Sequence, residues 1–314
     1  APLRQRNYQR IVGSPLVTCY FRQTHHKIVI TSKKMKGKIK QIGIIIGKYL
    51  LLITFWILSI VLADSLTPIL NEQGKPISTF FFEFIPFLGL VIGHFVMTKV
   101  FEKSTFDFVR VNKDNLLKNI VYGILFGLLW LTVSVIIICL LGNGKLNISF
   151  TLTAAQLLLF FFVLFINASM QELLVHGYLF SLLESKYSKL TALIATSFLF
   201  LLLHPGAINS GLTASINVFR AGLIFGLITI KFDSLICATF AHTVWNYFGA
   251  VWFGLIPLDN YPSMKLISVT GNSLLIGDKN GMETGFIVTV TMLTFVMYLW
   301  TRKQQVTRYW QKQG

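Results

Sequence analysis

The feature that most constrains this chain is a succession of long apolar runs. Eight can be counted, near residues 41–63, 79–98, 119–141, 154–183, 189–204, 213–230, 234–254 and 284–301. A helix of about 20 residues crosses the roughly 30 Å hydrocarbon core of a bilayer. The chain is 54% hydrophobic and only 13% charged, whereas soluble domains carry about 25% charged residues. The sequence therefore predicts an all-α integral membrane protein, a bundle of about eight transmembrane helices.

The charged residues between the runs predict how the chain crosses the membrane. The formal net charge is +16, and most of the basic residues fall on one predicted side. That side holds the segments 1–34, 99–118, 184–189 and 302–314, together with Lys231. The positive-inside rule then predicts a multi-pass protein of the cell membrane with both termini in the cytoplasm. Basic residues in such positions contact anionic lipid, so the bilayer is the expected partner and nucleic acid is not.

The ends of the chain differ from its apolar middle. Residues 1–34 contain seven Lys or Arg, two His and no Asp or Glu, so we expect a basic, disordered extension. Transmembrane helices follow over 35–150 and 151–301, and the basic tail 302–314 is expected in the cytoplasm. The three cysteines form no CxxC pair and are interpreted as small core residues: Cys19, Cys139 and Cys237.

A group of polar residues interrupts three of the apolar runs. Glu172 and His176 are four residues apart and share one helix face, as do His242 and Asn246. His204 ends the fifth run. At about 1.5 Å of rise per residue, Glu172, His204, His242 and Asn246 lie at depths of roughly 18, 22, 13 and 19 Å. Polar side chains from three helices are therefore expected in one layer of the membrane.

This layer contains the groups that amide hydrolysis requires. A carboxylate or an imidazole can deprotonate water, and a second imidazole with an amide can stabilise the oxyanion. Glu172, His204 and His242 could instead hold zinc, with a fourth position left for water. The alternative is a purely structural role, in which these residues hydrogen-bond between helices and stabilise the bundle.

Four further ionisable residues lie within the runs and have ordinary explanations as snorkelling, interfacial or interhelical groups: Lys48, Glu83, His94 and Arg220. Intramembrane charges also form proton relays, which makes a transporter or channel the alternative class. The sequence contains no inverted repeat and no matching pair of Gly- or Pro-broken half-helices, and this disfavours a transporter.

The motifs over roughly residues 155–290 resemble those of the CPBP intramembrane proteases, the family of CAAX prenyl proteases and of bacteriocin processing or immunity proteins. QELLVHGYLF, at 171–180, is similar to the motif EExxxR in its usual context EELLFRGYLF. Phe200 to His204 matches FxxxH, and His242 to Asn246 matches HxxxN after the Gly-rich stretch RAGLIFGL. The segment GNSLLIGDKNGMETGF, at 271–286, is similar to a Gly-rich, Glu-containing stretch that often precedes the last helix of bacterial members.

The resemblance implies a helical bundle that hydrolyses peptide bonds within the membrane. Its substrates would be small membrane-associated or lipidated peptides, such as bacteriocins or pheromones, cleaved for maturation or self-immunity. In the family, the first Glu of EExxxR and the FxxxH histidine activate water, while the HxxxN pair stabilises the oxyanion. The resemblance makes zinc an optional cofactor only.

The first motif departs from the family pattern at two positions. Gln171 stands at the first Glu and His176 at the Arg, while Glu172 fills the second Glu. Neighbouring helix residues point about 100° apart, so Glu172 cannot simply replace Gln171. Three readings follow: a peptidase whose base is Glu172 or a histidine, a pseudoprotease that acts as a membrane binding partner or scaffold, and a purely structural polar layer.

Overall fold

The computed structural model is helical over most of its length. It describes residues 15–72, 74–111, 115–148, 150–258 and 261–301, with side chains from residue 37 onward. The α-helices are α2 Pro15–Asn71, α3 Lys75–Val96, α4 Leu116–Leu141, α5 Ala154–Glu172, α6 Phe180–Lys186, α7 Lys189–Leu202, α8 Pro205–Asn209, α9 Leu212–Phe232, α10 Leu235–Asn246, α11 Ser273–Ile276 and α12 Phe286–Thr301. The predicted all-α class is confirmed.

Short π and 3-10 segments extend or link these helices. The π-helices are η1 Met97–Phe101, η3 Leu173–Leu179 and η4 Tyr247–Trp252, and the 3-10 helices are η2 Phe106–Val109 and η5 Met282–Thr284. The two strands β1 Lys145–Leu146 and β2 Ile267–Ser268 pair antiparallel. Regular structure outside the helices is therefore limited to one short ribbon within the described ranges.

The number of membrane-spanning helices differs from the simple count of apolar runs. In the described residues, five helices are long and apolar enough to cross a bilayer: Gly37–Asn71, Lys75–Phe101, Leu116–Leu141, Ala154–Lys186 and Leu212–Phe232. The apolar helices at 189–202 and 286–301 are shorter. The first of them, α7, is short because it ends just before His204 and Pro205. The protein is thus a multi-pass membrane protein, while the count of eight spans stays a prediction.

The first part of the chain forms a separate compact unit. Residues 1–48 and 49–314 are two units, and the functional residues all belong to the second. Helix α2 begins at Pro15, so the backbone of 15–34 is helical where the sequence led us to expect disorder. Residues 1–14 and the tail 302–314 lie outside the described part of the chain, and the expectations for them stay predictions.

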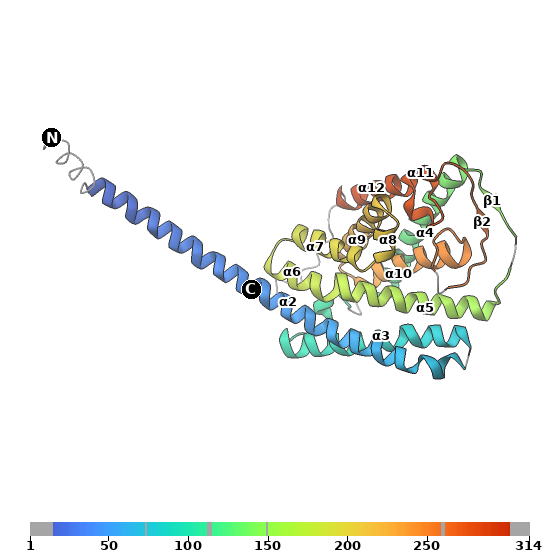
Figure 1. Ribbon diagram of the computed structural model, residues 1–314, viewed down its shortest axis with the longest axis horizontal. Helices are drawn as coiled ribbons and strands as arrows, with labels where there is room; N and C mark the ends of the chain where they lie inside the picture. Colours follow the sequence, from blue (N-terminus) through green and yellow to red (C-terminus); the bar gives the residue numbers. More distant parts are fainter. Residues whose placement is uncertain (1–14, 73, 112–114, 149, 259–260, 302–314) are drawn as a thin grey trace. The chain divides into compact units, whose positions relative to one another are not determined.

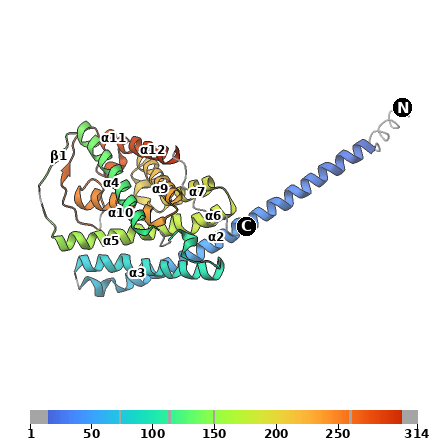
Figure 2. The same cartoon turned by 180° about the vertical axis from the view of Figure 1, so that it is seen from behind.

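Helix α5 is the element that organises the second unit. Together with η3 and α6 it forms one continuous helical segment, and α3 and α10 pack against different sides of α5 (Figures 1 and 2). The π segment begins directly after Glu172. Such wide turns are frequent at functional sites because they shift the side chains that follow them.

Close packing of α4 on α10 fixes the helix that carries His242. A Cβ atom on Gly127 would lie 2.7 Å from the carbonyl oxygen of Ala241, so only glycine allows this approach. The ring of Trp130 in α4 stacks on Trp245 in α10, with centroids 3.9 Å apart and an 18° interplanar angle. Both indoles are almost completely buried, and α10 is therefore held firmly in the core.

Candidate active site

Glu172 lies at the centre of the polar group and joins two imidazoles. Nδ1 of His176 lies 2.7 Å from Oε2 of Glu172, and Nδ1 of His242 lies 2.9 Å from Oε1. All three side chains are buried. A carboxylate only accepts hydrogen bonds, so both Nδ1 atoms must carry the proton. The basic atom of each neutral imidazole is then Nε2.

His204 presents its ring in the same way through a different partner. Its Nδ1 donates to the carbonyl oxygen of Phe200 at 2.6 Å. A carbonyl oxygen cannot donate, so the proton is on Nδ1 and Nε2 has the free lone pair. Pro205 begins the next helix and ends α7, because the residue before a proline avoids helical geometry. The break sets His204 at the end of α7.

The ring of Phe200 contacts three imidazole rings. Its centroid lies 4.4 Å from that of His204, 5.7 Å from that of His242 and 6.0 Å from that of His176. His204 also interacts electrostatically with His242 and with Glu172. Side chains from three helical segments therefore meet around one buried aromatic ring, as the common depth in the sequence predicts.

Gln171 belongs to a second polar network on another side of α5. Its Nε2 donates to Oδ1 of Asn167 at 2.7 Å, and Nδ2 of Asn167 donates to Oε2 of Glu83 at 3.0 Å. The hydroxyl of Tyr261 donates to Oε1 of Glu83 at 3.0 Å. No hydrogen bond in the described residues joins Gln171 to Glu172, His204 or His242. The sequence analysis interpreted Glu83 as an ordinary polar residue and did not identify Tyr261 at all.

Asn246 ends α10 one turn after His242. It is half-buried, and its side chain makes no hydrogen bond to any described residue. An amide on the same helix face as His242 is free to donate to a group that enters beside the imidazole. The neighbouring Trp245 is buried in the core, and its Nε1 donates to Oε1 of Glu283 at 2.9 Å. The sequence analysis did not single out Glu283.

The candidate zinc ligands Glu172, His204 and His242 lie near one another but are not arranged as a metal site. Among the described residues, no group of three His, Cys, Asp or Glu side chains is placed to hold a metal ion. The reason for Glu172 is direct: each of its oxygens accepts a hydrogen bond from an imidazole Nδ1. The residues present do not fit zinc as three ligands of one ion.

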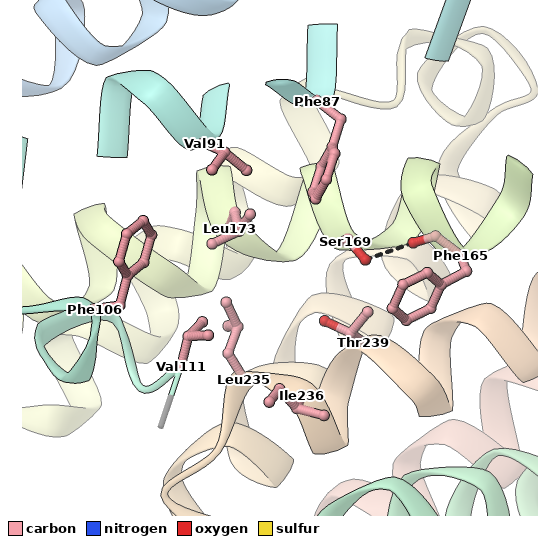
Figure 3. A pocket seen from close by; sticks show the side chains of 10 residues that line it. All are labelled: Phe87, Val91, Phe106, Val111, Phe165, Ser169, Leu173, Leu235, Ile236 and Thr239. Carbon is pink, nitrogen blue, oxygen red and sulfur yellow. Dashed lines mark hydrogen bonds between the residues drawn. The ribbon is translucent and has the colours of Figure 1, made fainter. Parts of the chain in front are cut away.

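An apolar pocket of about 340 Å³ lies between α3, α5 and α10 (Figure 3). Its wall includes Phe87 and Val91 of α3, Leu173 of η3, and Ile236 of α10. The few polar side chains on the wall include Thr239, which precedes His242 by one helical turn. The pocket offers an apolar environment on the helices that carry Glu172 and His242.

Comparison with known proteins gives one match. Residues 153–248 match the family model described as type II CAAX prenyl endopeptidase Rce1-like. This range includes Gln171, Glu172, His204 and Asn246, but not Glu83 or Glu283. No curated protein and no solved structure matches the chain. Over residues 153–248 the chain is therefore similar to the type II CAAX prenyl endopeptidases of the CPBP family.

Proposed function

We propose that this protein is an intramembrane endopeptidase that hydrolyses a peptide bond in a small membrane-associated or lipidated peptide. The observation that supports this most strongly is the Glu172 bridge between His176 and His242, beside His204. Glu172 fixes the protonated Nδ1 of His242 and directs its Nε2 away from the carboxylate. This is the arrangement in which a buried carboxylate orients an imidazole for proton transfer.

The proposed reaction assigns a role to each polar side chain. Nε2 of His204 accepts a hydrogen bond from the attacking water. In this scheme His242 carries a second proton on Nε2 beside the Glu172 carboxylate. Its Nε2–H and the amide of Asn246 then donate to the carbonyl oxygen, where negative charge forms as the water oxygen bonds to carbon. The C–N bond then breaks, and the leaving nitrogen takes up the proton that the attacking water released. In this scheme Glu172 and His176 are positioning residues, because both oxygens of Glu172 are engaged.

The apolar pocket supports a substrate with an apolar chain. Its walls match an acyl or isoprenoid group, or the apolar side chains of a membrane peptide. We propose a bacteriocin- or pheromone-like peptide as the substrate, and its maturation or self-immunity as the biological role. The charge asymmetry of the loops supports a site in the cell membrane with both termini in the cytoplasm.

A second candidate function follows from Gln171. An amide cannot take a proton from water, and here it is hydrogen-bonded to Asn167 rather than directed at the imidazoles. This favours a pseudoprotease that binds a membrane peptide or protein without cleaving it. The two candidates agree on the binding partner and differ in turnover.

The test is a cleavage assay in liposomes with a library of quenched peptides. Wild type is compared with His204→Ala, which removes the water-binding imidazole. Cleavage by wild type that is lost in His204→Ala supports the peptidase. Binding without cleavage by wild type, together with cleavage by Gln171→Glu, would establish the pseudoprotease instead.

A further inference from the structure

The proposed reaction needs a proton acceptor for the attacking water, and the motif position that supplies it in the family holds Gln171. Two carboxylates next to this position are unsuitable. Both oxygens of Glu172 accept from imidazoles, and both oxygens of Glu83 accept from Asn167 and Tyr261. Neither carboxylate therefore presents an oxygen without a hydrogen-bond partner to an attacking water.

Glu283 differs from these two carboxylates in having one oxygen available. Its Oε1 accepts from Nε1 of Trp245 at 2.9 Å, whereas Oε2 accepts no hydrogen bond from the described residues. Trp245 follows His242 by one turn of α10, and Glu283 interacts electrostatically with His242. The carboxylate of Glu283, in η5, therefore contacts the C-terminal part of α10 at Trp245 and lies within electrostatic range of His242.

The backbone around Glu283 is held firmly in place. Nδ2 of Asn217 in α9 donates to the carbonyl oxygen of Glu283 at 2.8 Å and to that of Gly285 at 3.3 Å. The hydroxyl of Thr289 donates to Oδ1 of Asn217 at 2.8 Å, so the amide is fixed in turn. Gly281 adopts a φ of 93°, which glycine tolerates far better than other residues. These hydrogen bonds fix the backbone from which the Glu283 side chain extends toward Trp245.

The surroundings also shift the pKa of the Glu283 carboxyl group. Burial raises the pKa of Glu283 above its ordinary value, while the Trp245 hydrogen bond and the nearby His242 act in the opposite direction. A carboxylate with a raised pKa accepts a proton more readily than an ordinary surface carboxylate. Its ionised form is still stabilised by one donor and one neighbouring imidazole.

We propose, resting on the peptidase function above, that Glu283 is the general base that replaces the missing first-motif glutamate. Its Oε2 takes a proton as the water oxygen bonds to the carbonyl carbon, and the carbonyl π electrons move to the oxygen. When this tetrahedral intermediate collapses, the C–N bond breaks and the proton passes from Glu283 to the leaving nitrogen. Glu283 lies outside the range 153–248 that matches the family.

The key variant is Glu283→Gln, because the glutamine oxygen still accepts from Trp245 but cannot take a proton. We expect kcat to fall about 10²–10⁴-fold with KM nearly unchanged. Glu283→Asp should retain partial activity, and Trp245→Phe should lower kcat by less than Glu283→Gln. Glu83→Gln serves as the matched control, since it removes a second intramembrane carboxylate that has no part in the reaction. Melting temperatures in detergent establish that each variant is folded.

The pH profile separates a base from a structural residue. The acidic limb of kcat in wild type should be lost in the residual activity of Glu283→Gln. If wild type cleaves, His204→Ala is inactive and Glu283→Gln cleaves like wild type, then Glu283 is not the base and the peptidase function survives. If wild type binds the peptides without cleaving any, the peptidase function and the role of Glu283 both fail.

Discussion

Two sides of helix α5 carry polar networks of opposite character, although they begin at neighbouring residues. Glu172 binds the imidazoles of His176 and His242, and the Nε2 atom of His242 makes no hydrogen bond to the described residues. Gln171 joins Asn167 and Glu83 in a chain that ends at Tyr261. The first network orients imidazole rings, which can exchange protons. The second network joins amide, phenol and carboxylate groups and contains no imidazole.

The difference shows that a buried carboxylate in a membrane protein is not by itself a sign of catalysis. Both Glu83 and Glu172 are costly to place in hydrocarbon, and each is stabilised by two hydrogen bonds. The partners differ in kind. Amide and phenol donors only stabilise the Glu83 carboxylate, whereas the imidazoles that Glu172 orients can themselves exchange protons. We therefore expect catalysis by the residues around Glu172, whereas the hydrogen bond of Glu83 to Asn167 holds α3 against α5.

The largest effect should come from breaking the first network with Glu172→Gln. The amide presents an NH₂ group to one of two protonated Nδ1 atoms, so one imidazole must turn or change tautomer. We expect kcat to fall about 10³–10⁴-fold, as for other buried carboxylates that orient a catalytic histidine. Cleavage by the variant is measured in liposomes, with Glu83→Gln as the matched carboxylate control. Wild-type kcat in Glu172→Gln would contradict the orienting role.

Breaking the second network with Glu83→Gln should affect stability and not turnover. The amide that replaces the carboxylate could no longer accept from both Asn167 and Tyr261, which leaves a buried donor unpaired at a cost of about 1–3 kcal/mol. The variant should therefore unfold at lower denaturant concentration while the folded protein cleaves at the wild-type rate. Loss of activity at full folding would move Glu83 into the catalytic network.

How far the sequence predicts this site depends on the distance along the chain between the partners. Glu172 and His176 are an i,i+4 pair, and the rise per residue places His204 and His242 at a similar depth, so their meeting was foreseeable. The separation of Gln171 from Glu172 follows from the angle of about 100° between neighbouring helix residues.

The partners that the sequence missed lie far apart or outside the motifs. Tyr261 is 178 residues from Glu83, and Glu283 is 38 residues beyond Trp245. Neither contact produces a periodic pattern, because both come from loops and short helical turns. The one available signal for Glu283 is a single glutamate in a Gly-rich segment, GDKNGMETG.

Gln171→Glu adds a second carboxylate to the network of Asn167 and Glu83, which we assign no role in catalysis. The new side chain loses the NH₂ group that donates to Oδ1 of Asn167 and brings negative charge toward Glu83. We expect a loss of about 1–2 kcal/mol in stability and no gain in kcat. The reverse result, a gain of more than about tenfold in kcat from an inactive wild type, would indicate a pseudoprotease. Gln156→Glu, on the same helix but half-buried in the capping box at its start, controls for added charge.

The smallest expected effect is that of metal removal. A zinc ion shared by Glu172 and His242 is disfavoured, because Nδ1 of His242 already donates to Glu172 and its Nε2 is directed away from that carboxylate. A metal ion would have to displace at least one protonated Nδ1 and rotate that imidazole within a core formed by Phe200 and Phe225. We therefore expect EDTA or phenanthroline to leave kcat within about twofold of wild type. Loss of activity that added zinc restores would overturn this prediction, and it would mean that the hydrogen bonds of Glu172 rearrange when the metal binds.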